Sequence, residues 1–157
     1  MSKDGFSEFI ERGGIYRDIM GENPEEVLTS LVGALPIFPS VPADTLLQAV
    51  LERELLMPTG IGKGIALPHP RNPVISPESE QFTVLAFLEK PVAWDSLDGE
   101  KVDTLMLIVS ASAKQHLSAL SEINFLCRQE AFIKLLKERP ALDEILAFIR
   151  EAEKKRK

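Results

Sequence analysis

Residues that bind metals or cross-link a chain are scarce in this sequence. It holds one cysteine, Cys127, and two histidines, His69 and His116, far apart along the chain. A single cysteine excludes an internal disulfide and is typical of a reducing compartment. Cys127 lies among apolar residues on a helical pattern, so we expect a buried, unreactive thiol. Because the three residues match none of the paired spacings of zinc sites, we predict no metal site.

Positive charge and long apolar runs are also in short supply. The chain has 18 Lys and Arg against 24 Asp and Glu, for a net charge of −6. Nucleic-acid binding needs a basic surface, so this balance argues against a DNA or RNA partner. No segment reaches the ~18 apolar residues that span a bilayer, and the charged N-terminus lacks a signal-peptide core. We therefore expect a cytoplasmic protein with no direct membrane insertion.

The hydrophobic patterns predict a single α/β domain. We expect an N-terminal arm over 1–14, the domain over 15–152 and a basic, solvated tail over 153–157. Helices are predicted from 24 to about 33, over 43–56, 113–130 and 131–137, and over 142–151. Strands are predicted over 65–67, 82–87 and 102–109, where apolar and β-branched residues run continuously. Such strands need cover on both sides, which predicts a small mixed β-sheet flanked by helices on both faces.

A glycine-rich loop lies between the helix at 43–56 and the strand at 65–67. Gly60, Gly62 and Gly64 repeat at every second position, and Lys63 precedes the last of them. The spacing is not that of a Walker A loop. The order helix, loop, strand also excludes the dinucleotide fingerprint, which needs a strand first. Two interpretations stay open: a tight turn between a helix and a strand, or a loop whose backbone N–H groups approach a bulky anion.

His69 stands at the end of this segment, between Pro68 and Pro70. The two prolines restrain the backbone on both sides and so fix where the imidazole points. Histidine is a good nucleophile that is easily neutral near pH 7, so a lone histidine here favours a phosphoryl acceptor over a metal ligand. The alternative is a histidine with no chemical role.

Arg53 and Glu54 place charge on or beside the core-facing stripe of the helix at 43–56, which is costly unless the charge is paired or used. One interpretation is a salt bridge near the helix end. The other is that Arg53 holds an oxyanion beside His69, a role that its planar fork suits, while Glu54 orients the arginine.

His116 lies in the first turns of the helix predicted after Ser112. Ser112 and Gln115 form a capping-box pattern, S-x-x-Q, which marks the start of that helix. The positive end of the helix dipole lowers an imidazole pKa, so we expect a neutral His116 that donates a hydrogen bond to a phosphoryl oxygen. Its apolar neighbours also permit a core histidine.

Four elements in order resemble the enzyme IIA proteins of the bacterial phosphotransferase system, of the fructose/mannitol type that includes the nitrogen-regulatory branch. These elements are Arg53-Glu54, the stretch TGIGKGIALPH at 59–69, DGEKV at 98–102 and QHL at 115–117. The resemblance covers roughly residues 15 to 150. It implies a mixed sheet flanked by helices, in agreement with the fold predicted above.

The resemblance implies a phosphocarrier, a transferase-class protein with a phosphohistidine intermediate and no cofactor. His69 would accept a phosphoryl group from the carrier HPr or a paralogue, His116 would support that group, and Arg53 would neutralise its charge. The group would pass to a IIB component or act as a switch on a regulated protein. The residues expected to support the site are Glu54, Thr59, Gly60, Gly62 and Gly64.

Several functions remain open at this stage. A chain without permease or HPr-like segments favours the nitrogen-regulatory branch. The alternatives are a stand-alone fructose/mannitol-type sugar component, a IIA-like regulatory module that works by binding alone, and a small-anion-binding domain with no covalent step. Pro58, Lys63 and Pro70 depart from the usual family pattern. Lys63 would add a positive charge near the phosphoryl site. Together, the three departures leave the donor and the acceptor undetermined.

Overall fold

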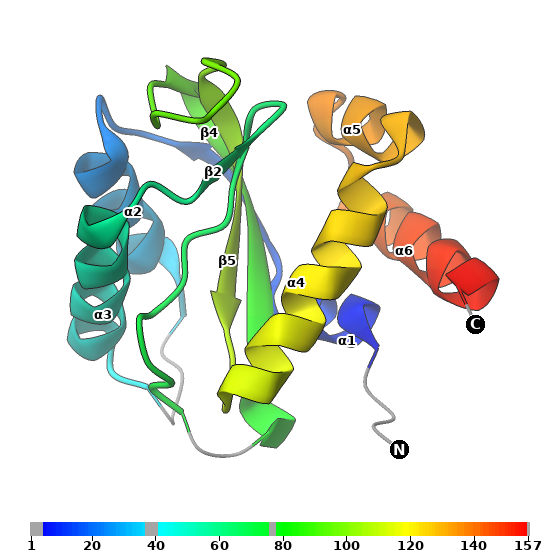
Figure 1. Cartoon of the computed structure of the whole chain (residues 1–157), viewed down its shortest axis with the longest axis horizontal. Helices are drawn as coiled ribbons and strands as arrows, with labels where there is room; N and C mark the ends of the chain where they lie inside the picture. Colours follow the sequence, from blue (N-terminus) through cyan, green and yellow to red (C-terminus); the bar gives the residue numbers. More distant parts are fainter. Residues whose placement is uncertain (1–4, 37–40, 76–77, 157) are drawn as a thin grey trace.

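Helices cover both faces of one five-stranded sheet (Figure 1). The computed structural model describes residues 5–36, 41–75 and 78–156. Helices α2 (Pro24–Ala34) and α3 (Ala43–Leu56) lie against one face of the sheet. The opposite face carries α1 (Phe6–Gly13), α4 (Ala113–Cys127), α5 (Glu130–Lys137) and α6 (Leu142–Arg156). A short 3-10 helix, Glu78–Glu80, precedes the longest strand. This is the predicted α/β architecture.

The sheet is mixed, as predicted, with the strand order β1-β4-β5-β3-β2. Its strands are β1 (Ile15–Ile19), β2 (Gly60–Gly62), β3 (Ile65–Ala66), β4 (Phe82–Val92) and β5 (Val102–Val109). β4 and β5 are antiparallel, with Ala86 opposite Leu105, and β1 lies parallel to β4. β3 lies parallel to β5, and β2 pairs antiparallel with β3. The carboxyl ends of β3 and β5 therefore lie at the same edge of the sheet.

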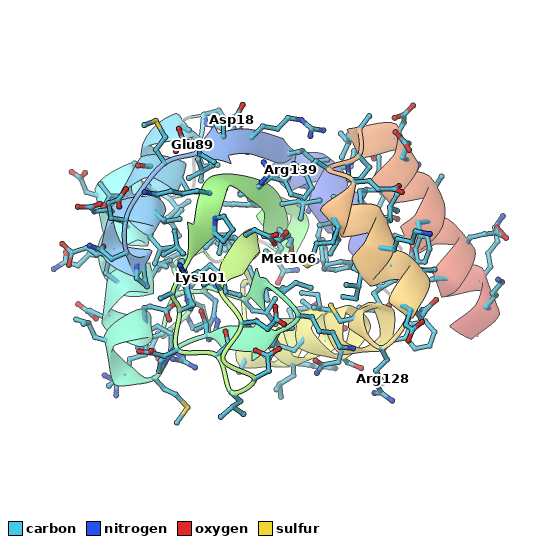
Figure 2. The ribbon with its side chains drawn as sticks, turned by 90° about the horizontal axis from the view of Figure 1, so that it is seen from above. Asp18, Glu89, Lys101, Met106, Arg128 and Arg139 are labelled. Carbon is cyan, nitrogen blue, oxygen red and sulfur yellow. The ribbon has the colours of Figure 1, made fainter. Side chains whose placement is uncertain are left out.

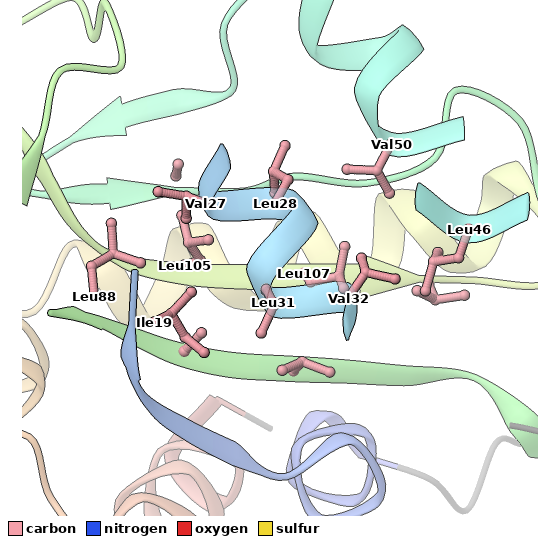
Figure 3. Packing of buried hydrophobic residues seen from close by; sticks show 14 of the residues in the cluster. Ile19, Val27, Leu28, Leu31, Val32, Leu46, Val50, Leu88, Leu105 and Leu107 are labelled. Atoms are coloured by element: carbon pink, nitrogen blue, oxygen red, sulfur yellow. The ribbon is translucent and has the colours of Figure 1, made fainter. Parts of the chain in front are cut away.

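Both faces of the central strands are buried, which explains their continuous apolar runs. Val84, Ala86 and Leu88 of β4 belong to the core under α2 and α3, whereas Leu85 and Phe87 belong to the core on the other side. This alternation follows from the two-residue period of a strand. Figure 3 shows the first core, where side chains of α2 and α3 meet those of β1, β4 and β5. Its labelled members are Ile19, Val27, Leu28, Leu31, Val32, Leu46, Val50, Leu88, Leu105 and Leu107.

The helix starts confirm the capping patterns of the sequence. The side chain of Asn23 accepts a hydrogen bond of 2.9 Å from the N–H of Glu26, and Pro24 is the first residue of α2. The hydroxyl of Ser112 accepts a hydrogen bond of 3.2 Å from the N–H of Gln115, so α4 begins where the capping box predicts. These caps satisfy N–H groups that have no partner inside a helix.

The described part of the segment predicted as an N-terminal arm, 1–14, contains the packed helix α1. Phe6 and Ile10 of α1 are 2% and 1% exposed. The carboxylate of Glu153 accepts hydrogen bonds of 3.0 Å from the N–H of Phe6 and from the hydroxyl of Ser7. α6 also continues to Arg156, into the segment expected to be a tail.

Two strands were missed in the sequence because each is short and irregular. β1 spans five residues and bends at Asp18, which has a positive φ of 55°. β2 spans only Gly60–Gly62, and glycine is rare in strands. Among the described residues, no helix is both long and apolar enough to cross a bilayer.

Candidate functional site

His69 lies just beyond the carboxyl end of β3, on a segment that runs down between α3 and α4 (Figure 1). The pairing with β5 continues past the strand, because the carbonyl of Pro68 accepts a hydrogen bond of 3.0 Å from the N–H of Ile108. The Nδ1 atom of His69 lies 2.8 Å from the carbonyl oxygen of Leu67. A carbonyl oxygen only accepts hydrogen bonds, so Nδ1 carries the proton. The lone pair of the neutral ring is therefore on Nε2.

His116 comes to His69 from the first turns of α4. The two ring centroids are 4.4 Å apart, and the ring planes are inclined at 42°. The contact follows from the topology, because β3 leads into His69 and its parallel neighbour β5 leads into the start of α4. In open α/β sheets, sites form at the carboxyl ends of strands in this way. The structure thus brings together the two histidines that the sequence singled out.

Arg53 lies on the wall of the same cavity, from the last turns of α3. Its Nη1 donates a hydrogen bond of 2.7 Å to the carbonyl oxygen of Met57, just past the helix end. The cavity has a volume of about 350 Å³. Its lining residues are Arg53, Leu56, His69, Pro70, Arg71, Asn72, Pro73, Ile108, Ser110, Ser112, Ala113 and His116. All the charged or titratable groups in this lining are basic, although the whole chain has a net charge of −6.

Burial in the cavity wall keeps both imidazoles neutral at pH 7. Desolvation is the main cause for His116, the neighbouring His69 and Arg53 add to it, and its pKa falls from 6.5 to about 4. Desolvation is also the largest effect on His69 and lowers its pKa, and the charge of Arg53 lowers it further. The hydrogen bond with the Leu67 carbonyl and the carboxylate of Glu54 raise this pKa, but the net shift is downward. A neutral imidazole keeps a lone pair, which a nucleophile needs.

The lowered pKa of His116 predicts a pH-dependent stability. Between pH 6.5 and about 4 the folded protein binds fewer protons at His116 than the unfolded chain does, so the free energy of unfolding falls as the pH falls. We expect this pH-dependent part of the free energy of unfolding to be absent from His116→Gln. Urea unfolding of both proteins at several pH values should show the variant gaining stability relative to wild type from pH 7.5 down to about 4. A difference that stays constant over this range contradicts the assignment.

Glu54 organises the start of the glycine-rich segment and does not pair with Arg53. Its carboxylate accepts hydrogen bonds from the N–H of Thr59 at 2.8 Å, the hydroxyl of Thr59 at 2.6 Å and the indole N–H of Trp94 at 3.1 Å. The expectation that it orients the arginine was wrong. The reason is that hydrogen bonds from Thr59 and Trp94 already occupy the carboxylate of Glu54. Glu54 thus holds Thr59 in place, and the carbonyl of Thr59 accepts a hydrogen bond of 3.0 Å from the N–H of Leu67, two residues before His69.

Glu54→Gln should therefore destabilise the fold. Glutamine keeps one acceptor oxygen for the two N–H groups but replaces a charged acceptor with a neutral one, so we expect a loss of about 1 kcal/mol in the free energy of unfolding. Urea denaturation at pH 7 measures this change. Glu52→Gln is the matched control, because Glu52 is an exposed residue of the same helix. Equal stability of the two variants contradicts this role for Glu54.

The glycine-rich loop is a β-hairpin and lies away from the two histidines. Lys63 and Gly64 both have positive φ angles, 58° and 82°, which is the pattern of the type I′ turn that joins β2 to β3. The Lys63 ammonium donates to the carbonyl of Cys127 at 3.2 Å, at the far end of α4 from His116. The expectation of an added charge near the phosphoryl site was thus wrong.

The glycines serve this hairpin by allowing close approaches. A side chain at Gly60 would meet the hydroxyl of Ser96, and one at Gly62 would meet the carboxylate of Asp98, which accepts a hydrogen bond from the Lys63 N–H. The tight-turn interpretation is therefore correct, and Gly60, Gly62 and Gly64 belong to this hairpin. Cys127 is buried beside this hairpin, and burial raises the pKa of its thiol to about 11, as expected of an unreactive cysteine.

The sequence reasoning missed Arg71, Asn72 and Ser110 as parts of the cavity wall. A signal for Arg71 was present: it is an arginine two residues after the predicted nucleophile, in the same proline-bounded loop. Ser110 had no such signal, since it enters the site only because β5 runs parallel to β3. In the part of the chain that the structure describes, no three His, Cys, Asp or Glu side chains gather as metal ligands.

The sequence pattern of one protein family matches almost the whole domain. The family is EIIA 2 of the phosphoenolpyruvate-dependent sugar phosphotransferase system, and the match covers residues 8–152. The chain therefore belongs to this family. The fold agrees: nitrogen regulatory protein IIA-Ntr from Neisseria meningitidis aligns with a TM-score of 0.77 at 22% identity, covering 91% of this chain and 97% of that one.

Relatives within the family carry two kinds of name. A nitrogen regulatory protein of Pseudomonas aeruginosa is 30% identical over 119 residues, which are 74% of this chain and 75% of that protein. One from Bradyrhizobium diazoefficiens is 33% identical over 92 residues, 57% of this chain and 58% of that protein, so this match spans less than two thirds of the relative. The fructose-specific EIIABC component of Bacillus subtilis is 34% identical over 112 residues, 68% of this chain but 17% of that protein.

Proposed function

We propose that this chain is a phosphocarrier of the phosphotransferase system and that His69 accepts the phosphoryl group. One observation carries the proposal: the Leu67 carbonyl holds the proton of His69 on Nδ1, and this leaves a nucleophilic Nε2 on a ring that lines a basic cavity. Phosphoryl transfer needs mainly positioning and charge stabilisation. Two histidines, an arginine, serine hydroxyls and the N-terminus of α4 supply both.

The proposed step is a direct transfer between two imidazoles. The lone pair of Nε2 attacks phosphorus, the nitrogen–phosphorus bond of the donor phosphohistidine breaks, and its electron pair stays on the donor nitrogen. The proton on Nδ1 stays in place throughout, hydrogen-bonded to the Leu67 carbonyl. His116 donates a hydrogen bond to a phosphoryl oxygen, and Arg53 balances the negative charge at the moment of transfer. The reverse of the same step passes the group to an acceptor.

An exposed apolar rim beside the cavity supports protein partners for this transfer. Leu56 and Met57, at the end of α3, are 60% and 64% exposed, and Leu117, next to His116, is 64% exposed. Exposed apolar side chains that gather at a site favour a docking surface. We propose an HPr-type carrier as the donor. One similar solved structure, with a TM-score of 0.64, is a complex of enzyme IIAMtl with phosphorylated enzyme IIBMtl from Escherichia coli. A IIB component or a regulated protein is the proposed acceptor.

Within the family, we place this chain in the nitrogen-regulatory branch. Support comes from the name of the Pseudomonas relative, which aligns with 74% of this chain. The second candidate is a sugar-specific IIA component, favoured by the 34% identity with the fructose-specific protein of Bacillus subtilis. Either function requires the cytoplasm, where phosphoenolpyruvate is the phosphoryl source.

Intact-mass measurement tests the proposed function. The chain is incubated with phosphoenolpyruvate, enzyme I and HPr, and in parallel with a nitrogen-type paralogue of HPr. We expect a gain of one phosphoryl mass that disappears in acid, since nitrogen–phosphorus bonds are acid-labile. If both carriers are visibly phosphorylated and the chain gains no mass, it is not a phosphocarrier and works by binding alone.

A further inference from the structure

We propose that Arg71 is a second arginine of the phosphoryl site, whose guanidinium holds the phosphoryl oxygens together with Arg53. This inference rests on the proposed function and adds a catalytic residue to it. The two arginines reach the cavity from different elements of the fold. Arg53 comes from the end of α3, and Arg71 comes from the loop that carries His69.

The position of Arg71 fits an anion that arrives at His69. It follows the nucleophile by two residues, and Pro70 and Pro73, which flank it, also line the cavity. Prolines restrict the backbone of such a loop, so the arginine side chain starts from a fixed point on the cavity wall. Its rotatable stem then allows the guanidinium to close on a group bound at His69.

The guanidinium of Arg71 is available for this contact. Arg71 is exposed, and within the described chain it has no hydrogen bond or ion pair of its own. Arg53, in contrast, already donates one N–H to the Met57 carbonyl. An arginine with all five donors unused at the mouth of a cavity is suited to bidentate recognition of a phosphoryl group.

The charge of the cavity also supports this role of Arg71. A phosphoryl group on histidine brings close to two negative charges into the site. Among the described residues, the lining holds no carboxylate and its two histidines are neutral at pH 7, so its charged side chains are Arg53 and Arg71. One guanidinium leaves much of the added charge unbalanced, whereas two balance it. Arg71 would thus stabilise both the transfer and the phosphorylated state.

A small phosphoryl donor separates this role from protein docking. Phosphoramidate transfers its phosphoryl group to histidine without a protein surface, so its rate reports on the cavity alone. We expect Arg71→Gln to slow phosphorylation of His69 about tenfold with both phosphoramidate and phospho-HPr, the value of one charge-assisted hydrogen bond. Arg71→Lys should recover part of the rate, because it keeps the charge and loses the fork. Arg128→Gln is the control, since Arg128 is exposed and points away from the body at the far end of α4 (Figure 2).

The outcomes are distinct from those of the proposed function. If wild type is not phosphorylated by either donor, the proposed function fails and Arg71 has no phosphoryl group to hold. If wild type is phosphorylated and Arg71→Gln matches it with both donors, Arg71 plays no part. If Arg71→Gln slows only the reaction with phospho-HPr, by raising KM, Arg71 serves donor docking and the proposal is wrong. The proposal is supported if Arg71→Gln lowers kcat with both donors and Arg128→Gln does not.

Discussion

Replacing His69 with alanine is expected to abolish phosphoryl acceptance, the largest single effect in this protein. Among the described side chains that line the cavity, no other combines a free nitrogen lone pair with a fixed tautomer, since His116 lacks the carbonyl contact that holds the proton of His69 on Nδ1. Intact mass after incubation with phosphoenolpyruvate, enzyme I and HPr measures the effect. The wild type should gain one phosphoryl mass and the variant none.

The fold should survive this change. His69 is half-buried on a loop, and its removal leaves both hydrophobic cores untouched. Near-ultraviolet circular dichroism of the variant should therefore match that of wild type, which excludes unfolding as the cause of lost activity. Retention of an acid-labile phosphoryl group in His69→Ala would mean that another residue is the acceptor.

Arg53→Gln is expected to slow phosphoryl transfer by about 100-fold, the usual cost of losing one charge-stabilising donor in a transition state. The variant keeps a side chain of similar length, so the loss reports on charge and on the guanidinium fork. Quenched-flow measurement of phosphoryl transfer from phospho-HPr, under single-turnover conditions, gives the rate.

Two further variants test whether the effect is specific to Arg53. Arg53→Lys should recover part of the rate, because it restores the charge. Lys134→Gln removes an exposed positive charge from α5, away from the cavity, and should leave the rate unchanged. If Lys134→Gln and Arg53→Gln slow the reaction equally, the effect comes from the net charge of the protein, and Arg53 has no specific role.

Local patterns predicted much of the fold. The helix at 43–56 and the strand at 102–109 have the predicted bounds, and the caps at Asn23 and Ser112 form the expected hydrogen bonds. These features depend on neighbours in sequence, such as a side chain and the N–H three residues later. The continuous apolar strands also predicted burial on both faces correctly, because a strand with one face in water typically alternates apolar and polar residues.

Features that depend on distant parts of the chain were predicted less well. Glu54 meets Trp94, and Lys63 meets the carbonyl of Cys127, only because the tertiary fold brings them together. The glycine repeat predicted a turn and an anion loop equally, and strand pairing decided for the turn. Arg71 had a local signal, its position two residues after His69, but its place in a cavity wall shared with α3, β5 and α4 depends on the tertiary fold.

The most direct test of the account is an NMR spectrum of the phosphorylated chain with ¹⁵N-labelled histidine. The protein has two histidines, so four ring nitrogens give the whole spectrum. We predict that phosphorus couples to Nε2 of His69, that Nδ1 of the same ring keeps its proton, and that His116 stays neutral and unmodified. Phosphorus coupled to Nδ1 of His69, or to either nitrogen of His116, would contradict the mechanism.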